Sequence, residues 1–257
     1  MSSGGSLALR LAAAGAFVLC IGVSGAAAAG GSATVAAAEV SWAGSKDAWE
    51  VRDTGVFSTE TGGRSWHRIY DEPAITILRL SATTGVIELG SDPGPCMCTT
   101  RKLWTNDDGT TWHSTDAIGT NFTGAGSELY WWQGGDLHLI SPFPPASSSK
   151  PLEAKLVSAL PDGTIVASTR TALGFAFLVS NRVAGQHWDT SPRVILSTAE
   201  GTQTVTLPSA PSGSLLAGGI DSADGVLTVT ATNYGTEPVA QVNWTSADNG
   251  QTWSLGS

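Results

Sequence analysis

Charged side chains are scarce in this chain of 257 residues. Asp, Glu, Lys and Arg make up only 14% of it, against roughly a quarter in an average globular domain. Lys and Arg number 13 and Asp and Glu 22, which gives a net charge of -9. So few basic groups cannot neutralise many phosphates. The composition therefore excludes nucleic acid and anionic membranes as partners.

Cysteine is also scarce, and only Cys96 and Cys98 lie outside the N-terminal apolar run. Two residues apart in a strand, they would share a face about 6.6 Å apart, which is the long end of disulfide geometry. Gly94 and Pro95 can supply the bend that a bridge needs. We predict a local disulfide here, with two free thiols or a metal or redox role as alternatives. A zinc site usually needs four ligands, and the sequence has no second cysteine pair.

Long apolar runs are missing after the first thirty residues. There, Arg10 precedes an apolar run over residues 11–23 and small residues over 24–29, which is the order of a secretory signal. The run is too short to cross a core of about 30 Å. We predict a signal peptide of residues 1–29, cleaved after Ala28 or Ala29, with an uncleaved anchor as the alternative. The domain of residues 30–257 is expected to be secreted or periplasmic, monomeric and free of the membrane.

No helical periodicity is present outside the signal. Short apolar segments instead recur about every ten residues between Gly, Asp, Asn, Ser and Pro, which indicates an all-β fold. The expected strands are 35–40, 74–80, 85–89, 128–132, 137–140, 154–160, 164–169, 174–179, 193–196, 202–207 and 226–232.

Three segments share an eight-residue pattern that ends in Trp, and a fourth keeps part of it. The pattern reads hydroxyl, any, Asp, any, Gly, any, hydroxyl, Trp. Its diagnostic residues are Thr61, Gly63 and Trp66; Asp107, Gly109 and Trp112; Gly185 and Trp188; and Asp248, Gly250 and Trp253. Gly permits the positive φ of a tight turn, Asp accepts backbone N–H groups, and Trp covers the hairpin. These residues are therefore predicted to be structural.

The segments resemble the Asp-box, also called the bacterial neuraminidase repeat, which occurs in sialidases and sortilin-type receptors. The resemblance covers about 32 residues directly. It implies a β-propeller in which each box joins the third and fourth strands of a blade at the outer rim. Thr61 and Val183 replace the Asp, so the first and fourth turns are expected to be less tightly held.

The spacing of the box tryptophans sets the number of blades. Trp66 and Trp112 are 46 residues apart, whereas Trp112 and Trp188 are 76 apart and leave room for a blade without a box. We predict an all-β propeller of four-stranded antiparallel blades, five in number, with six as the alternative. Segment 35–40 is expected to help close the ring.

The sequence lacks the motifs of a sialidase active site. The resemblance implies an Arg-Ile-Pro element and a Tyr nucleophile helped by a carboxylate. The nearest string here, residues 68–70, follows the first box and lacks Pro. Tyr70, Tyr130 and Tyr234 are the only tyrosines, and none has a matching carboxylate.

Other catalytic and metal-binding patterns are also missing. Glu88, Glu128, Asp136 and Asp162 show no spacing that pairs two of them. The histidines next to box tryptophans belong to different blades and should not converge on one metal. We predict no catalytic residue, no cofactor and no metal site.

The aromatic segment Tyr130, Trp131 and Trp132 on the blade without a box is the best binding candidate. Successive strand residues point to opposite faces, so one Trp could stack on a sugar or a peptide side chain. The alternative is that both pack between blades. We predict a secreted, non-enzymatic propeller that binds an unidentified protein or carbohydrate through its loop face. An extracytoplasmic glycoside hydrolase of sialidase-like type is the alternative.

Overall fold

The computed structural model of the chain describes residues 40–90, 100–119, 121–147, 150–181, 192–210, 215–233 and 239–256. Every regular element within these ranges is a β-strand, so this part of the chain contains no helix able to cross a membrane. The predicted signal peptide, the Cys96–Cys98 pair, Gly185, Trp188 and Tyr234 lie outside the described residues.

The described residues contain twenty strands, which form five antiparallel sheets of four consecutive strands each. Sheet A contains β1 (Val40–Trp42), β2 (Ala48–Arg52), β3 (Gly55–Thr59) and β4 (His67–Tyr70). Sheet B contains β5 (Thr76–Arg79), β6 (Gly85–Gly90), β7 (Thr100–Thr105) and β8 (His113–Thr115). Sheet C contains β9 (Asn121–Ala125), β10 (Glu128–Gln133), β11 (Asp136–Ile140) and β12 (Lys155–Ala159). Sheet D contains β13 (Gly163–Arg170), β14 (Gly174–Asn181), β15 (Arg193–Thr198) and β16 (Gly201–Thr206). Sheet E contains β17 (Leu215–Ala223), β18 (Val226–Asn233), β19 (Ala240–Ser246) and β20 (Ser254–Leu255).

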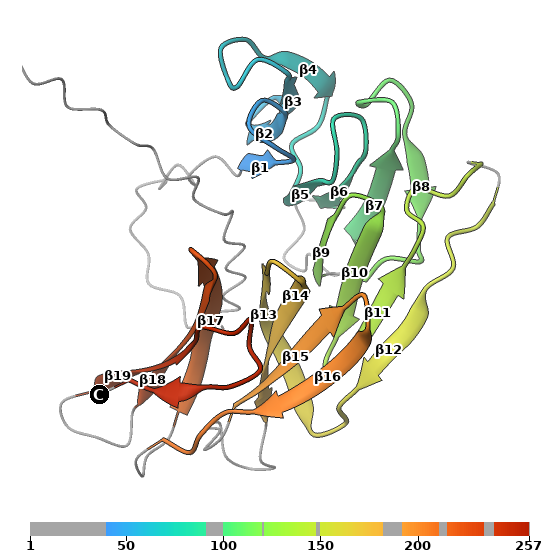
Figure 1. Cartoon of the computed structure of the whole chain (residues 1–257). Helices are drawn as coiled ribbons and strands as arrows, with labels where there is room; N and C mark the ends of the chain where they lie inside the picture. The colour runs from blue at the N-terminus through green and yellow to red at the C-terminus, as the bar shows by residue number, and fades with distance from the viewer. Residues whose placement is uncertain are drawn as a thin grey trace, which may run out of the picture.

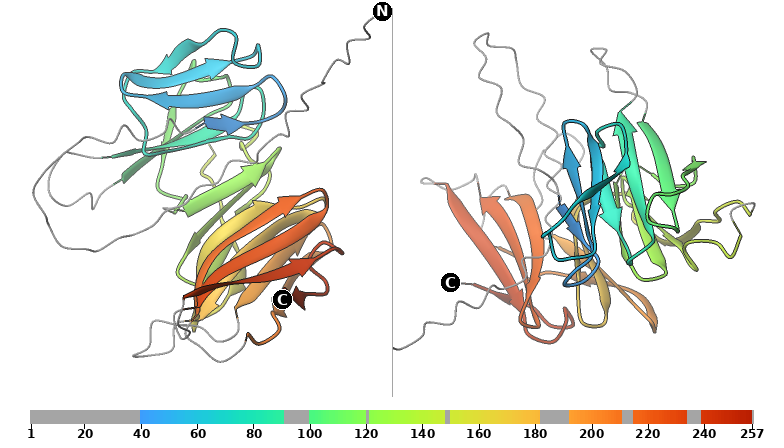
Figure 2. Two further views of the ribbon diagram at one scale, coloured as in Figure 1. Left: turned by 90° about the vertical axis from the view of Figure 1, so that its left-hand side faces the viewer. Right: turned by 90° about the horizontal axis from the view of Figure 1, so that it is seen from above.

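The sheets follow one another in chain order, from the blue sheet A at the top of Figure 1 to the red sheet E at its lower left. Strands β1 and β2 contact β5, β5 contacts β9, β10 contacts β13, and β13 and β14 contact β17. Figure 2 shows the same succession from two further sides. The protein is therefore a β-propeller of five four-stranded blades, as the sequence predicts.

Four apolar clusters fill the spaces between successive sheets. They contain Trp49 and Ile87 between A and B, Trp104 and Phe122 between B and C, Trp132 and Phe177 between C and D, and Leu196 and Trp244 between D and E. Burying each such side chain contributes about 1.5–3 kcal/mol. Sheets B, C and D are therefore covered on both faces, which explains the nearly continuous apolar runs of strands such as β6, β14 and β15.

Sheet E shows the opposite pattern, because among the described residues only its face toward sheet D packs against another sheet. In β18, Leu227, Val229 and Ala231 are buried toward sheet D and alternate with threonines. No apolar cluster joins sheets E and A within the described ranges. The sequence predicts that segment 35–40 helps to close the ring. Its one described residue, Val40, instead pairs with Glu50 inside sheet A, the first blade. Residues 35–39 lie outside the described residues.

The position of the Trp-ended segments agrees with the expectation in three sheets and differs in one. Segments 59–66, 105–112 and 246–253 join the third and fourth strands of sheets A, B and E. Segment 181–188 instead follows β14, the second strand of sheet D, so its expected place between third and fourth strands is wrong. In sheet D a short turn joins the third and fourth strands, β15 and β16, and Thr198 pairs with Gly201 across it. Sheet C has no such segment, as predicted, and residues 141–154 join its last two strands.

Candidate functional site

The aromatic candidate from the sequence lies in β10, in the middle of sheet C. Tyr130 and Trp132 point toward sheet D and are only 2% and 7% exposed. Their rings lie 5.4 and 5.7 Å from that of Phe177, and the Tyr130 hydroxyl shares a 3.1 Å hydrogen bond with Ser197 Oγ. The expectation of a ligand-binding platform is therefore corrected for these two residues, which fill the core between sheets C and D.

Trp131 points to the other face of sheet C, toward sheet B. Its ring stacks on His138 at a centroid distance of 3.9 Å and an interplanar angle of 1°. Gly119 approaches so closely that a Cβ there would lie 2.4 Å from the ring. Trp131 Nε1 is buried and has no hydrogen-bond partner in the described part of the chain. Trp131 thus packs between blades as well, which was the alternative that the sequence left open.

We call segments 59–66, 105–112 and 246–253 the Trp-closed turns. In the second, Thr105 Oγ1 accepts the Gly109 amide at 3.1 Å, and Asp107 Oδ1 accepts the Thr111 amide at 2.9 Å. The third repeats this with Ser246 and Asp248, which accept the Gly250 amide at 2.8 Å and the Thr252 amide at 2.9 Å. The turns therefore satisfy their own backbone donors.

The first turn keeps this geometry although it lacks the Asp. Thr61 Oγ1 accepts the Ser65 amide at 3.0 Å, and Thr59 Oγ1 accepts the Gly63 amide at 3.1 Å. A hydroxyl thus replaces one carboxylate oxygen. The indole of Trp66 donates to the Gly63 carbonyl at 3.1 Å, which folds the ring back over the turn.

The closing tryptophan of the second turn behaves differently. Trp112 Nε1 donates to the Ile69 carbonyl in sheet A at 3.2 Å, whereas Trp253 Nε1 donates to Gly250 in its own turn at 2.8 Å. The second turn therefore ties two blades together.

The carboxyl groups of the turns titrate at low pH. Hydrogen bonds from the Thr252 hydroxyl and amide and from the Ser246 hydroxyl lower the pKa of Asp248 to about 2. Burial raises the pKa of Asp107, but its hydrogen bonds with Thr111 and Thr105 outweigh burial, so the net shift is downward. Both groups are thus held as carboxylates, which suits acceptors and not general acids.

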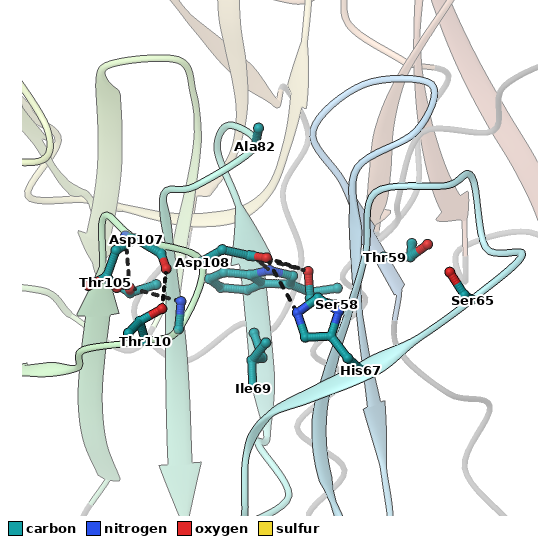
Figure 3. Close-up of polar contacts among 12 residues, drawn as sticks. Ser58, Thr59, Ser65, His67, Ile69, Ala82, Thr105, Asp107, Asp108 and Thr110 are labelled. Atoms are coloured by element: carbon teal, nitrogen blue, oxygen red, sulfur yellow. Dashed lines mark hydrogen bonds and ion pairs between the residues drawn. The ribbon is translucent and has the colours of Figure 1, made fainter.

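A buried polar network around Asp108 joins sheets A and B (Figure 3). Asp108 follows the Asp of the second turn at a φ of 51° and accepts 3.0 Å hydrogen bonds from Trp49 Nε1 and Ser58 Oγ. Arg79 Nη2 lies 3.2 Å from Asp108 Oδ1, and the Arg79 side chain is completely buried. The guanidinium also donates to the backbone carbonyls of Ala48, Thr59, Ser81 and Ala82. Burial lowers the pKa of Arg79, and Asp108 opposes that shift.

Ser58, Asp108 and His67 do not form a catalytic triad. Ser58 Oγ donates to both carboxylate oxygens of Asp108 at 3.0 Å, and His67 Nε2 lies 3.7 Å from Asp108 Oδ2. In a triad the imidazole lies between serine and carboxylate and takes the serine proton. Here the carboxylate is in the middle, and Ser58 is fully buried. The network is therefore a structural tie.

Among the described residues, no contact joins any two of the four carboxylates named from the sequence. Glu88 is buried against Lys102, with 3.5 Å between Oε1 and Nζ. Glu128 Oε2 lies 3.5 Å from the Tyr130 hydroxyl, and Asp136 and Asp162 are exposed. No group of three His, Cys, Asp or Glu side chains suited to a metal occurs in the described ranges.

A groove of about 590 Å³ lies along the outer edge of sheet B and is the best candidate for a binding site. Its lining comprises Trp104, Trp112, residues 113–117 and residues 150–152. Residues 113–117 of the lining are β8 and the two residues that follow it. Residues 150–152 belong to the loop between β11 and β12, which extends beside β8 in Figure 1. The His113 ring stands 4.4 Å from the buried Trp104 ring.

The rim of this groove carries two exposed charges. Asp116 and Lys150 are both exposed, and neither belongs to any of the ion pairs among the described residues. The sequence did not single out these two residues. The one signal at this place in the sequence is the Pro- and Ser-rich composition of residues 142–151, which is typical of an exposed connection and points to no ligand. The groove thus offers aromatic, hydroxyl and charged groups on one surface.

No family model matches the sequence, and no curated protein matches it. Several solved structures resemble the fold. A structure of YCF48 bound to a D1 peptide aligns at 14% identity with a TM-score of 0.46, over 84% of this chain and 79% of its own. The GH74 enzyme of Niastella koreensis aligns at 16% identity with a TM-score of 0.49, over 84% of this chain and 30% of its own. The AtxE2 isopeptidase in its apo form aligns at 10% identity with a TM-score of 0.35, over 85% of this chain and 39% of its own.

The first two of these structures are β-propellers. At such identities and TM-scores the similarities concern the fold alone. The assignment of five blades rests on the strand pairing of this chain, and its function has to be argued from its own groove.

Proposed function

We propose that the chain is an exported, non-enzymatic β-propeller that binds a protein or glycan partner. The groove beside β8 carries this proposal, because it is concave, combines indole and imidazole rings with hydroxyls, and bears the charges of Asp116 and Lys150. Its lining joins two tryptophans to hydroxyl and charged groups, and polar groups that converge on one concave surface are what orient a ligand. Export rests on the signal-like residues 1–29, and N-terminal sequencing of the exported protein should begin at Ala29 or Gly30.

The Trp-closed turns support membership of the Asp-box propellers as part of this proposal. The Asp and hydroxyl side chains accept the amides of their own turn, and the turns connect the outer two strands of their blades. The Asp and hydroxyl groups of these turns are therefore occupied by hydrogen bonds within the turns. They leave the groove as the surface that a partner would contact.

A hydrolase of sialidase type receives no support from Tyr70 and Tyr130, the two tyrosines among the described residues. Burial raises the pKa of Tyr70 and of Tyr130, whereas a nucleophile is activated by a neighbouring base or a lowered pKa. Tyr130 is also sealed in the core. A panel of aryl glycosides that includes sialosides should therefore release no fluorophore. Turnover that one carboxylate substitution abolishes would overturn the non-enzymatic proposal.

Binding through the groove is tested by charge reversal at its rim. The full chain, immobilised, should retain a partner from the medium of its host, and the variant Asp116→Lys/Lys150→Glu should lose it. The matched control Asp162→Lys/Lys155→Glu changes the same residue types at exposed positions outside the groove and should retain the partner. Equal retention by all three proteins would exclude the groove as the binding site.

A further inference from the structure

The groove is bordered by the free edge of a β-strand. β8 is the outermost strand of sheet B, and β7 is its strand partner among the described residues, through the pairs of Trp104 with His113, Leu103 with Ser114 and Lys102 with Thr115. An edge strand presents unpaired N–H and C=O groups to anything that lies alongside it. β8 itself spans three residues, about 10 Å of extended backbone, and the chain bends at residues 116–118, where the Ala117 amide donates to Thr115 Oγ1 at 3.1 Å. The groove therefore offers a short strand edge to a peptide backbone.

A neighbouring loop makes this edge different from a bare one. Residues 150–152 and Trp112 line the same groove as β8. Trp112 is held in place because its Nε1 donates to the Ile69 carbonyl and its ring meets the Tyr70 ring at 5.4 Å. A ligand in the groove would contact the backbone of β8 together with the side chains of Trp112 and of the loop. That is the arrangement by which an added strand gains affinity from main-chain hydrogen bonds and specificity from its side chains.

The charges at the rim define the chemistry of such a strand. Asp116 and Lys150 line the same groove without forming an ion pair with each other or with another described residue. A ligand that satisfies both must carry an acidic and a basic group. A peptide supplies these on side chains while its backbone runs along β8.

We propose that the groove binds an extended peptide segment of another protein, with one acidic and one basic side chain, which adds to sheet B as a fifth strand along β8. This inference rests on the proposed binding function and names the class of its ligand. Lys150 meets the acidic side chain of the peptide, and Asp116 meets the basic one.

The test selects heptapeptides from a random phage-displayed library on the full chain and measures their affinities by fluorescence polarisation. Methylation of one backbone nitrogen at a time then reports the binding mode, since only alternate residues of an added strand donate to the edge. We expect affinity to fall at least about tenfold at the alternate positions that lie along the three residues of β8, and to be kept at the other positions. Lys150→Glu should weaken binding about tenfold, and a peptide with its acidic residue changed to Lys should restore it. The control Lys155→Glu should have no effect.

A glycan array probed with the same proteins separates the two levels of the proposal. Glycan binding that Lys150→Glu abolishes, without any selected peptide, would overturn the peptide inference and leave the binding function standing. Peptides that tolerate methylation at every position, or that ignore both Lys150→Glu and Asp116→Lys, would also overturn it. If neither ligand class binds at the groove, the inference and the proposed function both fail.

Discussion

Removing the charge of Asp108 should destabilise the protein far more than removing a charge at its surface. Asp108→Asn is the informative change, because Asn keeps the size of the side chain and tolerates the positive φ of 51° at this position. Arg79 remains charged, and its side chain is completely buried. The substitution therefore leaves a buried guanidinium without its counter-charge, although its hydrogen bonds to backbone carbonyls persist.

The size of the effect follows from this uncompensated charge. Breaking a buried ion pair by removing one partner costs about 3–5 kcal/mol. For a domain of this length each kcal/mol lowers Tm by about 2–4 °C, so a fall of roughly 6–20 °C is expected. The matched control is Asp71→Asn, which removes the same charge from the exposed Arg68–Asp71 pair, with side chains 52% and 85% exposed. Asp71→Asn should lower the free energy of unfolding by less than about 1 kcal/mol.

Urea unfolding followed by tryptophan fluorescence measures both variants, since Trp49 donates to Asp108 at 3.0 Å. The double variant Arg79→Met/Asp108→Asn should recover part of the loss, because no charge is then left buried without a partner. Added salt should change the effect of Asp71→Asn more than that of Asp108→Asn. If Asp108→Asn were no more destabilising than Asp71→Asn, the network would not be the tie between sheets A and B that the distances indicate.

The turns allow three further predictions. Thr61→Asp gives the first turn the carboxylate of the other two and should raise the free energy of unfolding by about 0.5–1.5 kcal/mol; no gain over wild type in urea unfolding would contradict this. Asp248→Asn removes a group whose folded pKa, about 2, lies below its ordinary value of 3.8. Because the folded pKa is depressed, its contribution is complete above the ordinary pKa and is lost as the pH falls through the folded one. The difference in unfolding free energy between wild type and Asp248→Asn should therefore shrink from pH 4 to pH 2, and a difference independent of pH would refute the assignment. Gly109→Ala should destabilise by about 1–3 kcal/mol, since φ is 82° and the new Cβ would lie 2.7 Å from Ile69 Cβ; an unchanged Tm would show that the turn relaxes freely.

Much of the architecture could be predicted because it depends on short stretches of chain. The Trp-closed turns bond within eight residues, so their pattern is visible as a motif and recurs with a spacing that indicates blades. Short apolar segments likewise indicated strands in sheets B, C and D, where both faces are buried. Strands such as β8 and β20 escaped notice, because a strand of two or three residues shows no apolar run.

Where the motif weakened, the prediction went wrong. Segment 181–188 keeps a Gly and a Trp but follows the second strand of sheet D. The pairing of β14 with β15 sets its place, and that pairing depends on contacts outside the segment. Tyr130 and Trp132 were misassigned for the same kind of reason, since only the position of sheet D shows that they are buried.

By itself, the sequence determined the all-β class and the local geometry of the turns, because both follow from hydrogen bonds and periodicity over a few residues. The spacing of the tryptophans favoured five blades and left six as the alternative, and the strand pairing decided for five. The tertiary structure decided which faces are buried, how Arg79 meets Asp108 across 29 positions of chain, and where Trp112 and Lys150 line one groove. These features join residues far apart in the chain, and their proximity exists only once neighbouring sheets have packed.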